Sequence, residues 1–400
     1  MSELFKDITP TESQLQQPTP GGHFAVTGFR DVLYFAEIVR NEALERDCCR
    51  ILSYDFERTD WDTHVSLEIC AESDDAPTTV PTAVRFLELR QPGTAEESLF
   101  VRFTSPLGTR LLRLAPGSGC EPVAEPVRLI EDCFGFTRLA DLDGRLFGLG
   151  LDKDGWPGRI AGYRPESSTW QPADLPAFPD GGKRAVSEIS VFAGALYGAT
   201  VDGDRGFELW RWDGTEAEPA WRPVVERGAW RYAHNQKVLA MLRHGDGLYL
   251  VLGTSKEARR PESKFLDYLG FEVMRVAADG TWDLLVGTPR FSPNGLVVPL
   301  SGLGAGIRPG LQLEFLAGLS HHSRLILSLQ GVNGFHLWSS ADGEAWTPLH
   351  HAEFAAVYRV DGCQPIRLGE RVALVLETTD ALGNQSTRIW AGCPGEAVED

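Results

Sequence analysis

One residue in each of seven repeated units carries the side chain best placed for chemistry. Counting back from the hairpin of each unit puts this residue near the start of a strand expected to line a central axis. The seven are His23 or Ala25, Arg85, Arg138, Glu188, Lys237, Glu314 and Gln364, with the register of units one, five and six open by two residues.

The charges in this set predict anion binding and proton transfer. Arg85, Arg138 and Lys237 could hold an anionic group. Glu188 or Glu314 could act as a base whose pKa is raised in a partly desolvated channel. Buried charge is costly unless it is paired, so the alternative is a ring of mutually paired residues that holds water.

Histidine supplies one further candidate base. His234 enters the strand of unit five from the side with the long loops, and it joins Arg138, Glu188 and Glu314 as a catalytic candidate. The alternative for His234 is a hydrogen-bonded structural role. The pairs His321–His322 and His350–His351 predict no metal site, because adjacent residues on a strand point to opposite sides. We expect neither a metal nor a cofactor.

Aromatic side chains are the expected walls of a pocket at the channel mouth. Trp230, Tyr232 and Phe291 are the candidates, together with the ligand-binding residues Arg85 and Lys237. Phe291 belongs to an apolar stretch, 288–304, that could fold across the mouth as a lid. The alternative is a packed loop that only covers the top of two units.

A short apolar pair preceded by a turn opens a strand in each unit. The pairs are Leu33-Tyr34, Leu99-Phe100, Leu146-Phe147, Leu196-Tyr197, Leu248-Tyr249, Leu325-Ile326 and Val372-Ala373. By subtraction their first members are 66, 47, 50, 52, 77 and 47 residues apart. A period of about 40 to 50 residues is typical of a four-stranded propeller blade. The chain is therefore predicted to be all-β, a seven-bladed β-propeller of four-stranded antiparallel blades.

The last unit lacks an outer strand, and the N-terminus can supply it. The unit ends near Gly392, and the segment from Leu4 to Thr9 is predicted to form the outer strand that the unit lacks. We therefore predict that residues 3–9 complete the seventh blade and close the ring. Residues 1–400 then form a single β-propeller domain.

Four long segments fall on one predicted face of the ring. They lie near 40–50, 71–82, 255–269 and 287–310, whereas the turns on the other face are short. Long loops on a rigid scaffold are where function concentrates. The top-face mouth of the channel is therefore the expected site.

Composition limits the partners and the compartment. The formal net charge of −18 and the pI near 5.0 argue against nucleic acid and anionic membranes, which require a basic patch. The first twenty residues are polar, and no run of about 18 apolar residues occurs, so we expect a cytoplasmic protein without a membrane span. The seven cysteines have no CxxC spacing, which fits reduced thiols. The oligomeric state is left open.

The segments 135–150 and 325–346 carry the clearest family pattern. Between the Leu337-Trp338 strand and Trp346, the run Ser-Ala-Asp-Gly-Glu-Ala resembles a slightly shortened Asp-box. Over about residues 130–350 the chain resembles bacterial kelch-like or Asp-box propellers. This resemblance implies a fold rather than an activity. The chain is also similar in kind to the propeller half of the cyanobacterial enzymes that form cyclophanes. This resemblance implies that Arg138 of this chain could contact a leaving anion.

Three functions are consistent with these patterns. The first is a small-molecule biosynthetic enzyme of the cyclase, lyase or group-transfer type, whose substrate carries an anionic group. The second is a non-catalytic propeller that binds a ligand or a protein. The third is a glycoside-acting enzyme, which needs two opposed carboxylates, for which Glu188 and Glu314 are the available pair.

Overall fold

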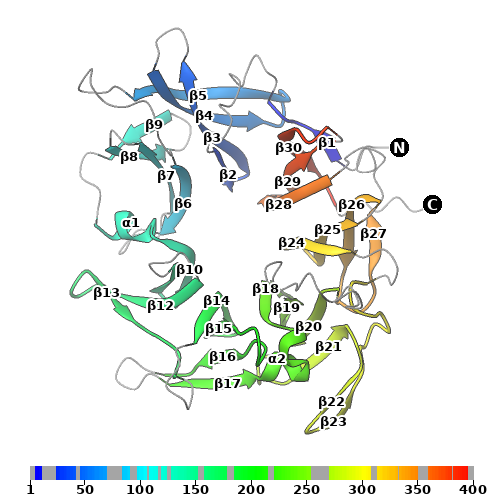
Figure 1. The fold of residues 1–400 in the computed structure, drawn as a ribbon. Coiled ribbons are helices and arrows are strands. Elements are labelled where there is room, and N and C mark those ends of the chain that lie inside the picture. The colour runs from blue at the N-terminus through cyan, green and yellow to red at the C-terminus, as the bar shows by residue number, and fades with distance from the viewer. Residues whose placement is uncertain are drawn as a thin grey trace.

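Seven four-stranded antiparallel sheets surround one central axis in the computed structural model (Figure 1). This confirms the predicted all-β, seven-bladed propeller. The structure describes residues 5–10, 24–41, 46–69, 83–90, 97–105, 108–115, 119–123, 128–151, 157–177, 184–214, 220–253, 270–307, 313–331, 333–349, 359–380 and 382–394.

The first three blades follow one another along the chain. Blade one is β2 (Phe24–Phe29), β3 (Val32–Asn41), β4 (Arg46–Asp55) and β5 (Asp60–Ile69). Blade two is β6 (Ala83–Arg90), β7 (Glu97–Ser105), β8 (Gly108–Ala115) and β9 (Gly119–Pro122). A short helix, α1 (Arg128–Cys133), leads into blade three, which is β10 (Phe136–Leu142), β11 (Arg145–Leu151), β12 (Pro157–Arg164) and β13 (Thr169–Pro172).

Blades four to six repeat this order from the axis outward. Blade four is β14 (Ala185–Phe192), β15 (Ala195–Val201), β16 (Leu209–Trp212) and β17 (Trp221–Val225). The turn α2 (Arg227–Trp230) and the 3-10 turn η1 (Tyr232–His234) lead to blade five, which is β18 (Lys237–His244), β19 (Gly247–Gly253), β20 (Glu272–Val276) and β21 (Trp282–Val286). Blade six is β24 (Glu314–His321), β25 (Arg324–Gly331), β26 (Gly334–Ser340) and β27 (Thr347–Leu349).

Blade seven joins the two ends of the chain. Its strands are β28 (Arg359–Leu368), β29 (Arg371–Thr379), β30 (Gln385–Gly392) and, as the outer strand, β1 (Phe5–Asp7). Phe5 pairs with Gly392 and Asp7 with Trp390 in antiparallel register. The predicted closure of the ring by an N-terminal strand is confirmed.

Each apolar pair of the sequence lies in the second strand of its blade, where burial is deepest. All residues of β19 are buried, and every residue of β15 except the last. Side chains from neighbouring sheets pack face to face: Leu209 and Val225 of blade four share a core with Leu250 and Met274 of blade five. The tight turns between inner and second strands use positive φ, as at Asp143 (51°) and Gly144 (83°).

The predicted insertions have different outcomes. The segment 40–50 is an extension of the β3–β4 hairpin rather than a long loop, because Asn41 still pairs with Arg46. Cross-strand pairing satisfies the backbone there, which makes a long irregular loop unnecessary. The segments 71–82 and 255–269 lie outside the described residues.

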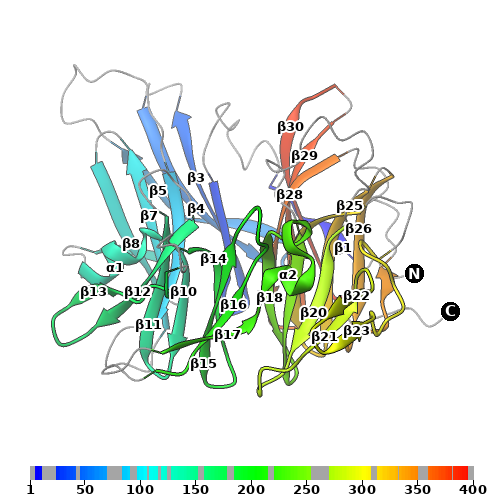
Figure 2. The same cartoon turned by 60° about the horizontal axis from the view of Figure 1, so that its bottom comes forward.

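The predicted lid is a separate hairpin outside the ring. Strands β22 (Arg290–Ser292) and β23 (Gly295–Val297) form their own two-stranded sheet, which projects beyond β21 (Figures 1 and 2). The chain then returns along β21, where the Leu300 and Ser301 amides donate to Leu284 and Leu285. These bonds direct the segment along the rim of blade five, so the expectation that it covers the channel is wrong.

Candidate functional site

The inner strands of the seven blades carry equivalent residues at one level. In each blade, this residue pairs across the ladder with a residue of the second strand, three positions after the first member of the apolar pair. In blade four, for example, the apolar pair begins at Leu196, and Glu188 pairs with Ala199. The residues at this level, which we call the channel level, are Ala25, Arg85, Arg138, Glu188, Ala240, Ala317 and Gln364. Its charged members lie on three consecutive blades, two to four.

Two of the predicted residues lie away from the channel level. Lys237 pairs with Gly253 and Glu314 with Gln330, so both are at the first position of their inner strands. A β-bulge separates each of them from the alanine that occupies the channel level in its blade. The prediction left the register of units five and six open, and the structure places Lys237 and Glu314 away from the level of Arg138 and Glu188. In blade one, His23 lies outside the described residues.

Arg138 and Glu188 meet across the junction of blades three and four. The Arg138 Nε donates to the Glu188 Oε1 at 3.0 Å. The Arg138 side chain is 59% exposed, whereas the Glu188 side chain is only 11% exposed. Arg85, one blade earlier, is also exposed and donates to the main-chain oxygen of Phe134 at 3.4 Å. The structure therefore places one exposed cation, Arg138, beside the buried carboxyl group of Glu188, and a second exposed cation, Arg85, at the same level one blade before Arg138.

The buried position of Glu188 changes its acidity. Burial raises the pKa of Glu188 above its ordinary value of 4.5, and the charge of Arg138 and the amide of Ile189 oppose this only in part. A carboxyl group with a raised pKa exchanges protons closer to neutral pH than an exposed one. Glu188 is therefore suited to act as a base or an acid.

A second arginine–glutamate group, which the sequence did not predict, lies in blade five. The fully buried Glu272 accepts hydrogen bonds from Arg231 at 2.7 Å, from Asn235 at 2.7 Å and from the Thr288 amide at 2.8 Å. The Arg290 Nη1 contacts both of its oxygens, at 2.9 and 2.7 Å. The one sequence signal is a lone carboxylate within the apolar run around β20.

The charge on Glu272 is fixed by these partners. Burial pushes the pKa of Glu272 up, but the charges of Arg290 and Arg231 and the bonds from Asn235 and Thr288 hold it below 4.5. Glu272 therefore stays ionised and ties together three segments: the connection into blade five, β20, and the foot of the β22–β23 hairpin. Such a group can anchor structure but cannot readily exchange a proton.

The connection from blade four to blade five contains a left-handed turn. Residues 227–230 of α2 have φ values of 54°, 60°, 55° and 66°, although only Gly228 is a glycine. Each non-glycine residue in this region costs roughly 1–2 kcal/mol. The Asn235 side chain donates to the main-chain oxygen of Gly228 and to Glu272, and so holds the turn in place. Strain of this kind concentrates at functional sites.

The predicted pocket-wall residues lie on this connection and on the hairpin. Trp230 is half-buried under the Arg227 guanidinium, while Tyr232 and His234 are exposed. Phe291 is 78% exposed on β22, outside the ring. The structure therefore places Phe291 outside the ring and His234 in the exposed turn that leads into β18.

The two adjacent histidine pairs have different outcomes. His321 ends β24, and His322 lies in the turn after it and pairs with Glu370 at 3.1 Å. The pair His350–His351 lies outside the described residues. Within the described part of the chain, no group of three or more His, Cys, Asp or Glu residues could hold a metal ion.

Comparison with known proteins shows the fold. No protein-family model matches the chain, and no curated protein matches it. The polysaccharide lyase Uly1 matches 94% of this chain and 90% of its own, with 12% identity and a TM-score of 0.53. An acylaminoacyl peptidase from Pyrococcus horikoshii matches with 11% identity and a TM-score of 0.47, and this chain spans about 51% of it.

The likeness to the polysaccharide lyase shows a shared fold and nothing finer. The propeller domain of the Trilobed protease from Pyrococcus furiosus matches 92% of this chain, with 8% identity and a TM-score of 0.45. The resemblances to Asp-box propellers and to cyclophane-forming enzymes therefore stay predictions. In the described residues, no helix is long and apolar enough to cross a membrane.

Proposed function

We propose that this propeller is an enzyme that transfers a proton on a small molecule carrying an anionic group, at the channel level of blades two to four. The observation that carries the proposal is the buried Glu188, whose Oε1 lies 3.0 Å from the Nε of the exposed Arg138. Such a pair offers a proton-transfer group and an anion-binding group side by side.

A lyase is the reaction class that these two groups fit best. In such a reaction, Arg138 and Arg85 would hold the carboxylate of the substrate and so favour loss of a proton from the adjacent carbon. Glu188 would take that proton, the C–H electrons would form the new double bond, and a β-substituent would leave with its bonding pair. Acidic sugars can undergo this reaction, and the polysaccharide lyase with the same fold makes them the first class to test.

The test is a turnover assay on acidic oligosaccharides, followed by the ultraviolet absorbance of the new double bond. We expect Glu188→Gln to lose about 10²- to 10⁴-fold in turnover while substrate still binds. Arg138→Ala should weaken binding. A matched control is Arg159→Ala, which removes an exposed arginine paired with Asp174 in blade three. Turnover that survives in Glu188→Gln would contradict the proposal.

The alternative is a propeller that binds a ligand without changing it. In that case, a ligand found by thermal-shift screening would bind wild type and Glu188→Gln equally and would be recovered intact.

The glycoside-acting alternative has less support, because Glu188 and Glu314 lie at different levels of nonadjacent blades. A cyclase or a group-transfer enzyme would use the same two residues and would appear as a product without the double bond.

A further inference from the structure

The inner strands of blades five and six both end at a histidine, His244 and His321. Both ring nitrogens of His244 have a hydrogen-bond partner. In blade five, the Nδ1 of His244 lies 3.0 Å from the Ser320 hydroxyl, and its Nε2 lies 2.8 Å from the main-chain oxygen of Ala341. Ala341 opens the turn after β26, where Asp342 accepts the amides of Glu344 and Ala345. This turn covers the junction of blades five and six.

His321 occupies the equivalent position in blade six but lacks these partners. The two histidines occupy the same ladder position, since His244 pairs with Gly247 and His321 with Arg324. Along β28, Arg367 takes the place of Ser320, because it pairs with the first residue of the apolar pair in its own blade. His321 is 6% exposed, and its Nε2 finds no hydrogen-bond partner in the described structure.

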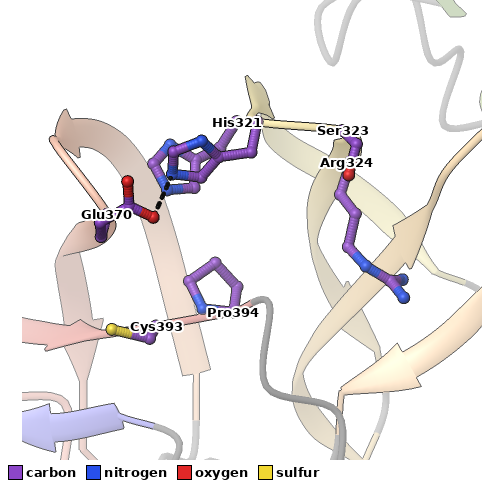
Figure 3. A pocket seen from close by; sticks show the side chains of 7 residues that line it. His321, Ser323, Arg324, Glu370, Cys393 and Pro394 are labelled. Carbon is purple, nitrogen blue, oxygen red and sulfur yellow. Dashed lines mark ion pairs between the residues drawn. The ribbon is translucent and has the colours of Figure 1, made fainter.

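At the junction of blades six and seven, a pocket of about 390 Å³ opens where the corresponding turn would lie. Cys393 and Pro394 continue β30 at the level of Ala341 and Asp342, and they line the pocket below His321 (Figure 3). Glu370 and the His321 ring lie along its upper side (Figure 3). His321, whose buried Nε2 has no partner in the described structure, thus lines a space large enough for a small molecule.

The charges around His321 come from every element packed against it. His322 lies on its own turn and is paired with Glu370 of the β28–β29 turn. Arg367 of β28 lies close enough to act on the ring, and Arg243 of β18 acts on Arg367 in turn. Around the ring, Arg324 of β25 donates to the Ser339 hydroxyl, and Cys393 directly follows the end of β30.

The surroundings of His321 favour its neutral ring. Burial lowers its pKa below the ordinary value of 6.5, and His322 and Arg367 lower the pKa further, whereas the main chain and the charge of Glu370 raise it. The main chain of Glu370 acts on the ring as a hydrogen-bond acceptor. A neutral imidazole has one N–H, so donation from Nδ1 to this acceptor leaves Nε2 without a proton. A ligand with a hydrogen-bond acceptor can therefore bond to Nε2 only after the ring has taken up a proton.

We propose that this pocket is a second binding site, which takes the oxyanion of a small acidic molecule together with one proton from solvent. The proton goes to His321, whose Nε2 then donates to the oxyanion as the Nε2 of His244 donates to Ala341. The charge of Arg367 favours the anion, whereas the Glu370 carboxylate, which is paired with His322, opposes it. The site lies at the hairpin-turn end of the blades, on the face opposite the long connections, and it is independent of the proposed lyase chemistry.

The test uses sulfate, which does not titrate between pH 5 and 8, with chloride at matched ionic strength as its control. Calorimetric titration in two buffers of different ionisation enthalpy gives the number of protons taken up on binding. We expect about one proton per sulfate at pH 7, and an affinity that rises up to about tenfold for each unit of pH lost. Binding without proton uptake, or no binding of sulfate beyond that of chloride, would overturn the proposal.

Three variants separate the pocket from the rest of the surface. His321→Gln should lose the proton uptake and at least about tenfold in affinity, because a charge-assisted hydrogen bond is lost. Arg367→Gln should weaken sulfate while keeping the proton uptake. The control Arg159→Gln, which removes an exposed arginine paired with Asp174 in blade three, should keep both. Thermal unfolding of each variant shows that it is folded, and equal binding by His321→Gln and wild type would contradict the assignment.

Discussion

This propeller contains two arginine–glutamate groups of the same chemical types. Their surroundings shift the pKa values of the two carboxyl groups in opposite directions. Glu188 has one arginine, which is exposed, and its pKa is raised by burial. Glu272 has two enclosed arginines, an asparagine and a backbone amide, and its pKa is lowered in spite of deeper burial. The number of donors around the carboxyl group, rather than its burial, decides the direction of the shift.

The difference separates a group that can react from one that holds the structure. Glu188 can gain or lose a proton with little rearrangement, and its cation faces solvent. Glu272 connects segments on both sides of blade five, and all its oxygen contacts are internal. A buried ion pair becomes strongly destabilising when one partner is removed, because the other charge remains unpaired.

The largest effect is therefore expected at Glu272. Glu272→Gln leaves Arg231 and Arg290 as buried cations and should lower the free energy of unfolding by about 3–5 kcal/mol. Urea unfolding measures this, with Asp174→Asn as the control, since it breaks an exposed pair and should cost at most about 1 kcal/mol. Equal losses in the two variants would show that the blade-five group is not an anchor.

A smaller effect is expected at Gly287, beside the same carboxylate. A Cβ at this position would lie 2.6 Å from the Glu272 Oε1, so Gly287→Ala should cost about 1–3 kcal/mol through displacement of the carboxylate. The matched control is Gly203→Ala, where an added Cβ meets nothing within 4 Å. Thermal unfolding of both variants makes the comparison, and an unchanged Gly287→Ala would mean that the carboxylate can move freely.

The pH dependence of stability sharpens the contrast. The stability that Glu272 contributes is present above its unfolded pKa, and it is lost as the pH falls through its lower folded value. The gap between wild type and Glu272→Gln should therefore be widest at neutral pH and shrink below about pH 4.5. Urea unfolding between pH 3 and 7 tests this, and a gap of constant width would contradict the lowered pKa.

The smallest effect on stability is expected at Glu188. Its raised pKa favours the protonated form in the folded state, so its contribution is present below pH 4.5 and is lost as the pH rises through the folded value. At neutral pH, Glu188→Gln should stay within about 1 kcal/mol of wild type, or slightly above it. A large loss in the same urea experiment would make Glu188 an anchor like Glu272.

The parts of the molecule with a local sequence signal could be predicted. The apolar pairs located the second strands, because those strands are buried on both faces, and the unpaired end of blade seven indicated the closing strand. Arg138 and Glu188 could be placed because their hairpins are short and regular. Lys237 and Glu314 were placed at the wrong level because an alanine, with no chemical signal, occupies the channel level of their blades.

The rest depends on contacts that no local pattern carries. Glu272 is held by residues 41 and 18 positions away, from connections on either side of its blade. The direction of the β22–β23 hairpin follows from the amides of Leu300 and Ser301 on β21, and these are main-chain bonds that most residue types could make. The bonding of His244 and its absence at His321 likewise appear only once two junctions can be compared.

The closing strand also has a consequence in time. The Ile389 amide donates to the hydroxyl of Thr9, which lies 380 residues away in the chain. During synthesis, blade seven cannot assemble until almost the whole chain has emerged, and until then β2 to β27 wait as an open arc whose last faces are uncovered. Contacts this distant in sequence form slowly, and exposed sheet edges favour aggregation. The first nine residues thus act last in folding, and the ring is most vulnerable just before it closes.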